Sequence, residues 1–137
     1  MCIDERKIIR IVLEHYPMVQ AIYVYGSFAE ESAAIRPESD IDLALLLPFT
    51  EQHQLMFTQL HDELIRQTGR EVDLVNLRHA DTILQKEVIA AEKCIYCKDR
   101  NKVIEFEMLV LSFYQELNQQ RAAIVEQGLK DGRFYQP

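Results

Sequence analysis

Three aspartates carry a pattern that is typical of a catalytic site. Asp40 and Asp42 are separated by one residue at the start of an apolar run, and Asp73 lies in a later run of similar character. Residues two apart in a strand point to the same face, so Asp40 and Asp42 are expected side by side. Carboxylates held this close repel each other unless a cation lies between them, and hard oxygen ligands suit a divalent cation such as Mg²⁺. The spacing therefore predicts a metal site to which Asp73 adds a third oxygen ligand or a general base.

Twelve residues separate a glycine–serine pair, Gly26-Ser27, from Asp40. The pair follows Ala21–Tyr25, a run of strand-forming residues, and is therefore expected at a strand end. Glycine has no Cβ, so backbone N–H groups there can approach a phosphate closely, and the serine hydroxyl can bond to it. A phosphate site beside a metal site is what phosphoryl and nucleotidyl transfer require. An isolated D-x-D pair is also common on solvent-facing strand edges, but its ordered combination with Gly26-Ser27 and Asp73 favours catalysis.

The hydrophobic pattern indicates the elements that must position these groups. Strands are expected over Ala21–Tyr25, Asp40–Leu47, Glu71–Asn76 and Cys94–Cys97, the last at a sheet edge. Helices are expected from the N-cap Asp4 to Pro17, from near Thr50 to Gly69, over Ala80–Lys93, and from about Asp99 to Gly128. A loop is expected over Glu30–Ser39 and a frayed end over Leu129–Pro137. The predicted fold class is α+β, with a small mixed sheet packed with helices and a long C-terminal helix, in one domain over residues 1–137.

The last predicted helix carries apolar residues every three or four positions, which is the pattern of one buried face. These residues are Val103, Phe106, Leu109, Val110, Phe113, Leu117 and Ile124. Packing against the core of the domain is the simplest interpretation of this face. The alternative is that part of it, notably Phe113, Tyr114 and Leu117, packs on a partner.

Cysteine and histidine offer weaker candidates for a metal site. Cys94 and Cys97 have the spacing of zinc ligands, but no second pair of Cys or His follows at a suitable distance. Redox Cys-x-x-Cys motifs begin a helix, whereas these two cysteines flank strand-like residues. We therefore interpret Cys94 and Cys97 as small apolar residues at a sheet edge. The four histidines show no metal-ligand spacing, and His53 and His61, which fall on the same predicted helix, are expected to be solvated.

Composition and charge exclude several classes of function. The 137 residues suffice for one compact domain, 48% are hydrophobic, and the net charge is −7. This excess of carboxylates argues against direct binding of nucleic acid, which needs clustered Lys and Arg, but not against a polyanion held through divalent cations. No apolar run is long enough to span a membrane, and the N-terminus has no signal-peptide pattern. With an odd number of cysteines, three, the chain is expected in the reducing cytoplasm.

The segments Gly26-Ser27, Ser39–Leu43 and Val72–Val75 resemble the minimal nucleotidyltransferases of the DNA polymerase β-like superfamily. The length, the layout and the segment Val72–Tyr96 are most similar to the MntA-type antitoxins. Those antitoxins are protein adenylyltransferases encoded beside a HepT-type HEPN ribonuclease toxin. The resemblance implies Mg²⁺-dependent transfer of AMP from ATP, the co-substrate, onto a tyrosine hydroxyl of the toxin.

The resemblance also implies a role for each residue of the motifs. Asp40 and Asp42 would hold the metal, and Asp73 would complete the set and take the tyrosine proton. Gly26 and Ser27 would contact the phosphates of ATP.

Two features depart from the family pattern. The spacing between Ser27 and Asp40 is longer than usual, and Glu30-Glu31 stands where many relatives have an Arg-Gly or Gln-Gly pair. A longer surface loop costs little closure entropy, so the site is expected to survive it. The two glutamates are expected to point away from the triphosphate, and Arg36 is expected to supply the missing positive charge.

Two further functions stay open on the sequence alone. A binding-only antitoxin would neutralise its toxin by occlusion, with an acidic surface against a basic RNA-cleaving site. A small-molecule nucleotidyltransferase is disfavoured, because no separate substrate domain accompanies the catalytic one. The main expectation is an enzyme, a nucleotidyltransferase whose partners are ATP and a HEPN-type toxin, with no direct contact to nucleic acid or membrane.

Overall fold

The computed structural model describes residues 4–26, 40–48 and 57–130. Within them the elements are α1 (Glu5–His15), β1 (Ala21–Tyr25), β2 (Ile41–Leu46), α2 (Thr58–Thr68), β3 (Val72–Asn76), α3 (Thr82–Ala90), β4 (Cys94–Cys97) and α4 (Arg100–Lys130). The strands form a mixed sheet in the order β3-β2-β1-β4, in which β2 and β3 are parallel and the other neighbours are antiparallel. The predicted α+β class and the edge position of β4, where Cys94 and Cys97 are exposed, are confirmed.

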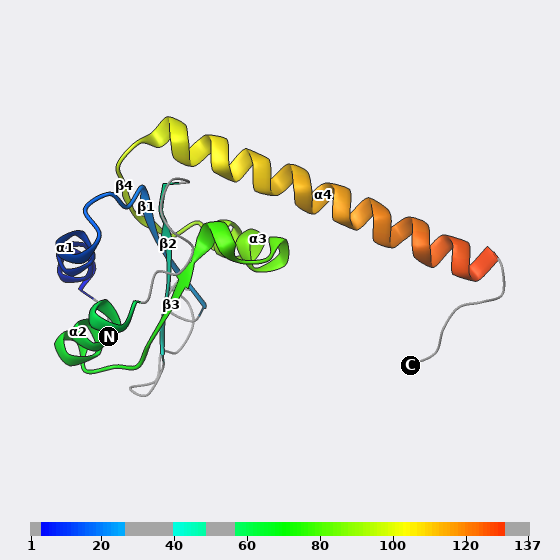
Figure 1. Ribbon diagram of the computed structural model, residues 1–137. Coiled ribbons are helices and arrows are strands. Elements are labelled where there is room, and N and C mark those ends of the chain that lie inside the picture. The colour runs from blue at the N-terminus through cyan, green and yellow to red at the C-terminus, as the bar shows by residue number, and fades with distance from the viewer. Residues whose placement is uncertain (1–3, 27–39, 49–56, 131–137) are drawn as a thin grey trace.

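Helices cover both faces of the sheet, with α1 and α2 on one side and α3 and α4 on the other (Figure 1). Alternate residues of β2 therefore enter two separate cores. The core beneath α1 and α2 contains Ile41, Leu43 and Leu45, and the core beneath α3 and α4 contains Ala44 and Leu46. Because side chains alternate along a strand, Asp42 points to the same side as Ala44. The face with the predicted catalytic aspartates is thus the one that α3 and α4 partly cover.

Local sequence signals explain several helix ends. The side chain of Asp4 caps α1 by accepting a hydrogen bond from the Lys7 N–H at 3.2 Å. Asp81 caps α3 in the same way, accepting from the Leu84 N–H at 2.8 Å. Side-chain caps of this kind satisfy amide groups that have no partner inside the helix. At the end of α2, Gly69 takes a left-handed conformation with a φ of 70°, as predicted for a glycine cap.

The start of α2 differs from the prediction. The helix begins at Thr58 rather than near Thr50, and Phe57 occupies its N-cap position without a capping hydrogen bond from its side chain. Apolar spacing alone extended the predicted helix backwards, because no capping residue marks the true start. Residues 49–56, like the predicted loop over 30–39, lie outside the described part of the chain.

The boundaries of α3 and α4 also differ from those predicted. α3 spans Thr82–Ala90 instead of Ala80–Lys93, since a 3₁₀ turn precedes the Asp81 cap. At its other end Glu92 has a φ of 55°, which a helix does not accommodate. α4 continues to Lys130, beyond the predicted end. None of the described helices is long and apolar enough to cross a membrane.

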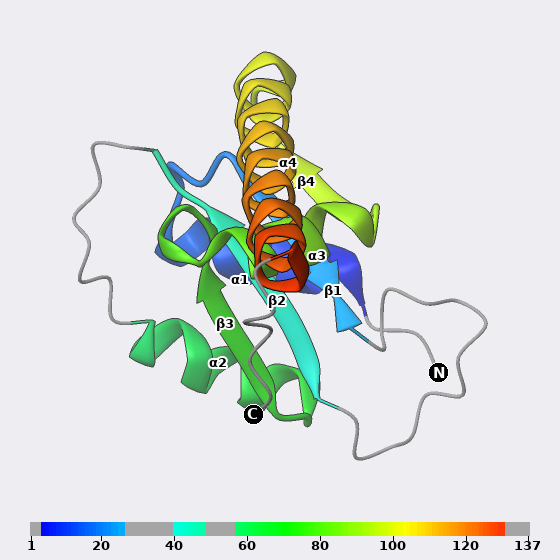
Figure 2. The ribbon, with the colours of Figure 1, turned by 90° about the vertical axis from the view of Figure 1, so that its right-hand side faces the viewer.

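α4 extends well beyond the sheet and α3 (Figure 1), and in Figure 2 its far end points toward the viewer. Its first turns are anchored by Val103, Phe106 and Val110, none more than 7% exposed. Farther along the same helix, Phe113 is 49% exposed and Ile124 is 71% exposed. The expectation that the whole apolar face packs on the core is therefore wrong for the second half of α4. The physical reason is that the elements beneath the helix end before the helix does.

Candidate active site

The register of the sheet brings the predicted site residues to one end of three adjacent strands. Asp42 pairs with Asp73 across the parallel β2–β3 neighbours and with Tyr25 across the antiparallel β1–β2 neighbours. Register partners lie on strands about 4.8 Å apart and point to the same face, here the face toward α3 and α4. Asp40 directly precedes β2, two residues from Asp42, and Gly26 directly follows β1. The prediction that the aspartate strands are neighbours and in phase is confirmed.

Gly26 is required at its position for two physical reasons. Its φ of 72° lies in the left-handed region that favours glycine. In addition, a Cβ at Gly26 would lie only 2.3 Å from Oδ2 of Asp42, far inside van der Waals contact. The sequence predicts a glycine here for the approach of a phosphate. The structure adds that the missing side chain leaves room for a carboxylate of the site.

Negative charge accumulates at this end of the sheet. The pKa of Asp42 is raised first by burial and then by the carboxylates of Asp73, Asp40 and Glu87. Burial, followed by Asp42, Asp73 and Glu87, also raises the pKa of Tyr25 to about 12. Every charged group that shifts these two pKa values, among the described residues, is a carboxylate. A cation at this site would therefore relieve repulsion that the fold itself imposes.

The residues at this end of the sheet fit a Mg²⁺ ion in their chemistry. Their donors are hard carboxylate oxygens, and Asp42 and Asp73 start from paired backbone positions. Over residues 4–26, 40–48 and 57–130, no three His, Cys, Asp or Glu side chains are gathered closely enough to hold an ion. The carboxylates of Asp40, Asp42 and Asp73 would thus turn toward a shared cation from backbone positions that are already adjacent.

Two side chains at the site are not predicted from the sequence. Tyr25 faces the aspartates because it is the register partner of Asp42, and only 7% of it is exposed. Glu87 on α3 adds negative charge that contributes to the raised pKa values of Asp42 and Tyr25. Strand alternation places Tyr25 and Tyr23 on one face of β1. No local signal in the sequence shows that β2 is the neighbouring strand or which of its residues pairs with Tyr25. The position of Glu87 depends on how α3 packs on the sheet, which the sequence pattern does not specify.

The other predicted phosphate contacts, Ser27 and Arg36, lie outside the described residues, as do Glu30, Glu31 and His53. Their predicted roles therefore stay predictions.

A cavity of about 280 Å³ opens beside Asp73, between β3 and α2. Phe57, Thr58, His61 and residues 72–74 line it. Nε2 of His61 donates a hydrogen bond to the Val72 carbonyl at 2.7 Å. The sequence suggests that His61 is solvated, but in the structure its ring forms a hydrogen bond within the protein. It joins α2 to the strand that carries Asp73.

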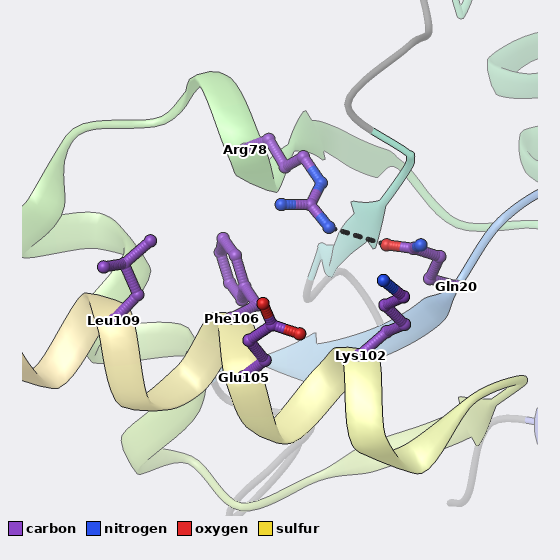
Figure 3. A pocket seen from close by; sticks show the side chains of 6 residues that line it. All are labelled: Gln20, Arg78, Lys102, Glu105, Phe106 and Leu109. Carbon is purple, nitrogen blue, oxygen red and sulfur yellow. Dashed lines mark hydrogen bonds between the residues drawn. The ribbon is translucent and has the colours of Figure 1, made fainter.

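A second charged cluster lies at the opposite end of the same strands. Arg78 donates from Nε to the Leu47 carbonyl and from Nη2 to Oε1 of Gln20 at 2.7 Å. Its guanidinium lies over the ring of Phe106, 5.2 Å from the centroid (Figure 3). The cavity lined by these groups holds about 180 Å³. These contacts of Arg78 join the ends of β1 and β2 to α4.

Comparisons with known proteins identify the family. Residues 6–101 match the model of the family described as Polymerase beta, Nucleotidyltransferase. Over 124 residues the chain is 31% identical to the protein adenylyltransferase MntA of Shewanella oneidensis, covering 90% of this chain and 86% of that protein. The chain belongs to the MntA branch of the polymerase beta nucleotidyltransferases. It is therefore a transferase by family, as the motifs predict.

Solved structures show the same fold. A crystal structure of a toxin–antitoxin with AMP-PNP contains a chain 29% identical to this one, with a TM-score of 0.74, covering 92% of this chain and 98% of that chain. The structure of a tri-AMPylated HEPN toxin of Shewanella oneidensis in complex with MNT antitoxin contains a chain 28% identical, with a TM-score of 0.69, covering 91% and 95%. The predicted nucleotidyltransferase fold and the resemblance to MntA are confirmed.

Proposed function

We propose that this protein is an antitoxin that transfers AMP from ATP to a tyrosine of a HEPN-type ribonuclease toxin and thereby silences it. The observation that supports this most strongly is the pairing of Asp42 with Asp73, with Gly26 against Asp42, at one end of the sheet. A relative that covers most of the chain is a protein adenylyltransferase. The AMPylated HEPN toxin bound to a related antitoxin indicates the class of substrate.

In the proposed reaction, the tyrosine oxygen forms a bond to the α-phosphorus of ATP. The bond from that phosphorus to the bridging β-phosphate oxygen breaks, and pyrophosphate leaves. Asp73, which is exposed on the edge strand β3, accepts the tyrosine proton. Asp40, Asp42 and Asp73 would hold Mg²⁺. When bound, that ion supplies neutralisation of phosphate charge and alignment of the reacting oxygens.

Gly26, Ser27 and Arg36 are the proposed phosphate contacts. Gly26 contributes by exposing its backbone without a Cβ, and Ser27 contributes a hydroxyl. Arg36 would supply the positive charge that many relatives place closer to the glycine–serine pair. Reversing the charge of Arg36 should weaken the binding of ATP in calorimetry, and unchanged affinity would remove it from the site.

The experiment that tests the function uses this protein at a lower molar concentration than the toxin. A molar excess of a HEPN-type toxin is incubated with the wild-type protein, ATP and Mg²⁺. An enzyme turns over, so the excess toxin should lose its ribonuclease activity, stay inactive after this protein is removed, and gain mass in steps of AMP. Added phosphate charge and bulk on the tyrosine would oppose the approach of RNA.

An Asp73→Asn variant provides the internal test, with Asp62→Asn as its matched control. An amide neither accepts the tyrosine proton nor binds a metal as strongly as a carboxylate, so Asp73→Asn should fail to silence the toxin. Asp62 is a carboxylate on α2, 71% exposed, whose Oδ1 lies 3.9 Å from Nδ1 of His61, and its replacement should leave AMP transfer unchanged. Protection that needs one antitoxin per toxin, needs no ATP and reverses on separation would instead indicate a binding-only antitoxin.

A further inference from the structure

The buried stripe of α4 continues beyond the part of the helix that the domain covers. Val103, Phe106 and Val110 form its buried part, and Phe113 and Ile124 continue it at the same helical spacing. These two side chains are 49% and 71% exposed. In this part of α4 the apolar stripe is therefore exposed, and another protein surface is needed to bury it.

The middle of α4 is apolar on its other sides as well. Residues 108–114 contain no charged residue, and Met108 is 66% exposed, Leu109 48% and Leu111 42%. A helix that is apolar all round is normally buried. Exposed apolar surfaces of this kind mark interaction sites in soluble proteins. The composition therefore indicates that this segment is covered in an assembly.

The uncovered stripe is continuous with the candidate active site through α3. The ammonium of Lys86 on α3 lies 5.2 Å from the ring centroid of Tyr114 on α4. Tyr25, the register partner of Asp42, lies in the same buried cluster as Phe106 and Val110 of α4. α4 lies on the same side of the sheet as α3 (Figures 1 and 2). Asp42 points to that side as well, because it alternates along β2 in phase with Ala44. A protein lying against the exposed stripe and α3 would therefore be beside the catalytic residues.

We propose that the apolar stripe Phe113–Ile124 of α4 is the docking surface for the protein substrate, the HEPN-type toxin, and that it holds the target tyrosine beside the aspartates. The inference rests on the proposed function, because a tyrosine within a folded protein needs a recognition surface larger than the small cavities at the site. A second copy of this chain would cover the stripe equally well but would make no use of its position beside the site.

A pair of double variants tests the proposal. Phe113→Glu/Ile124→Glu places charges on the stripe, whereas Gln115→Glu/Ala122→Glu places the same number of charges on the opposite side of α4, at exposed positions outside residues 108–114. Neither variant replaces a buried residue, so both should fold, as circular dichroism can verify. Toxin affinity is measured by titration calorimetry, and AMP transfer is measured on both the folded toxin and a short peptide that contains the target tyrosine.

The stripe variant should bind the toxin at least about tenfold more weakly, because a few buried anchors supply most of the affinity of an interface. Its transfer to the folded toxin should fall with affinity, while transfer to the peptide, which does not use the stripe, should match that of the wild type. The control variant should behave as the wild type. Because the contact is apolar, the affinity should depend only weakly on salt.

Wild-type toxin affinity in the stripe variant would overturn the proposal. It would also be overturned by sedimentation showing a dimer of the wild-type protein that the stripe variant dissociates without any loss of toxin binding. A wild-type protein that binds the toxin through the stripe but transfers no AMP would leave the docking surface standing and reject the proposed chemistry. The two claims therefore fail separately.

Discussion

Two half-buried charged clusters lie at opposite ends of the same strands, and they are built in opposite ways. At one end burial, followed by the carboxylates of Asp73, Asp40 and Glu87, raises the pKa of Asp42. At the other end Arg78 is held by the Leu47 carbonyl and by Gln20 and the ring of Phe106 (Figure 3). One charge has partners of its own sign, and the other has partners that stabilise it.

The contrast distinguishes a site that binds a ligand, at Asp42, from a cluster that stabilises the fold, at Arg78. A buried charge with good partners holds elements together, because breaking the cluster leaves polar groups without bonds. Buried charges of one sign cost folding free energy until a ligand of opposite charge arrives, and that cost is recovered on binding. Loss of Asp42 should therefore affect function, and loss of Arg78 should affect stability.

The largest effect is expected from Asp42→Asn at the carboxylate end. Transfer of AMP to the toxin should fall about a thousandfold or more, because the amide removes both a metal ligand and its charge. Initial rates with labelled ATP measure this, with Asp62→Asn as the control. A rate near that of the wild type would remove Asp42 from the catalytic site.

A smaller effect, of the opposite kind, is expected from Arg78→Ala. The change removes the donors to the Leu47 carbonyl and to Gln20 and the cation over Phe106. The free energy of unfolding, measured by urea titration, should fall by about 2–4 kcal/mol. Arg78→Lys keeps the charge but loses the forked geometry, so it should recover only part of the loss. Well below the unfolding transition, AMP transfer by Arg78→Ala should equal that of the wild type; a large loss would mean that the two ends are coupled.

The smallest effect is expected from Gly26→Ala, for which Gly69→Ala is a natural control. Both glycines have a φ near 70°, but only at Gly26 would a Cβ collide, with Oδ2 of Asp42, whereas Gly69 has nothing within 4 Å. Each change should cost about 1–2 kcal/mol through its conformation. Only Gly26→Ala should also lower AMP transfer, because Asp42 must move. Equal activity of the two variants would show that Asp42 tolerates displacement.

Much of the fold is predictable because its local signals agree. The caps at Asp4 and Gly69 and the apolar run Ala21–Tyr25 each fix an element where the structure has it. The start of α2 is not predictable, since Phe57 gives no capping signal. The exposure of the apolar face in the second half of α4 is not predictable either. Helical spacing shows that a face is apolar but not how far the domain beneath it extends.

The candidate site is predictable only as far as spacing along the chain reaches. The phase of Asp40 and Asp42 follows from strand alternation, and the placement of Asp73 required only that its strand be a neighbour. The contributions of Tyr25 and Glu87 required the register of β1 on β2 and the packing of α3, which are set by contacts distant in sequence. No sequence pattern distinguishes Arg78 from other basic residues. Its role depends on contacts with the ends of β1 and β2 and with α4, which only the tertiary structure brings together.

Thermal unfolding with and without Mg²⁺ and ATP tests the contrast between the two ends most directly. For the wild-type protein, the midpoint should rise when both ligands are present, by the equivalent of about 2.7 kcal/mol at a hundredfold excess over the dissociation constant. Without ligands, Asp42→Asn should be at least as stable as the wild type, because it relieves the repulsion, and Mg²⁺ with ATP should raise its midpoint little. An Asp42→Asn protein that is less stable than the wild type without ligands, and equally stabilised by them, would contradict a cation site at this end of the sheet.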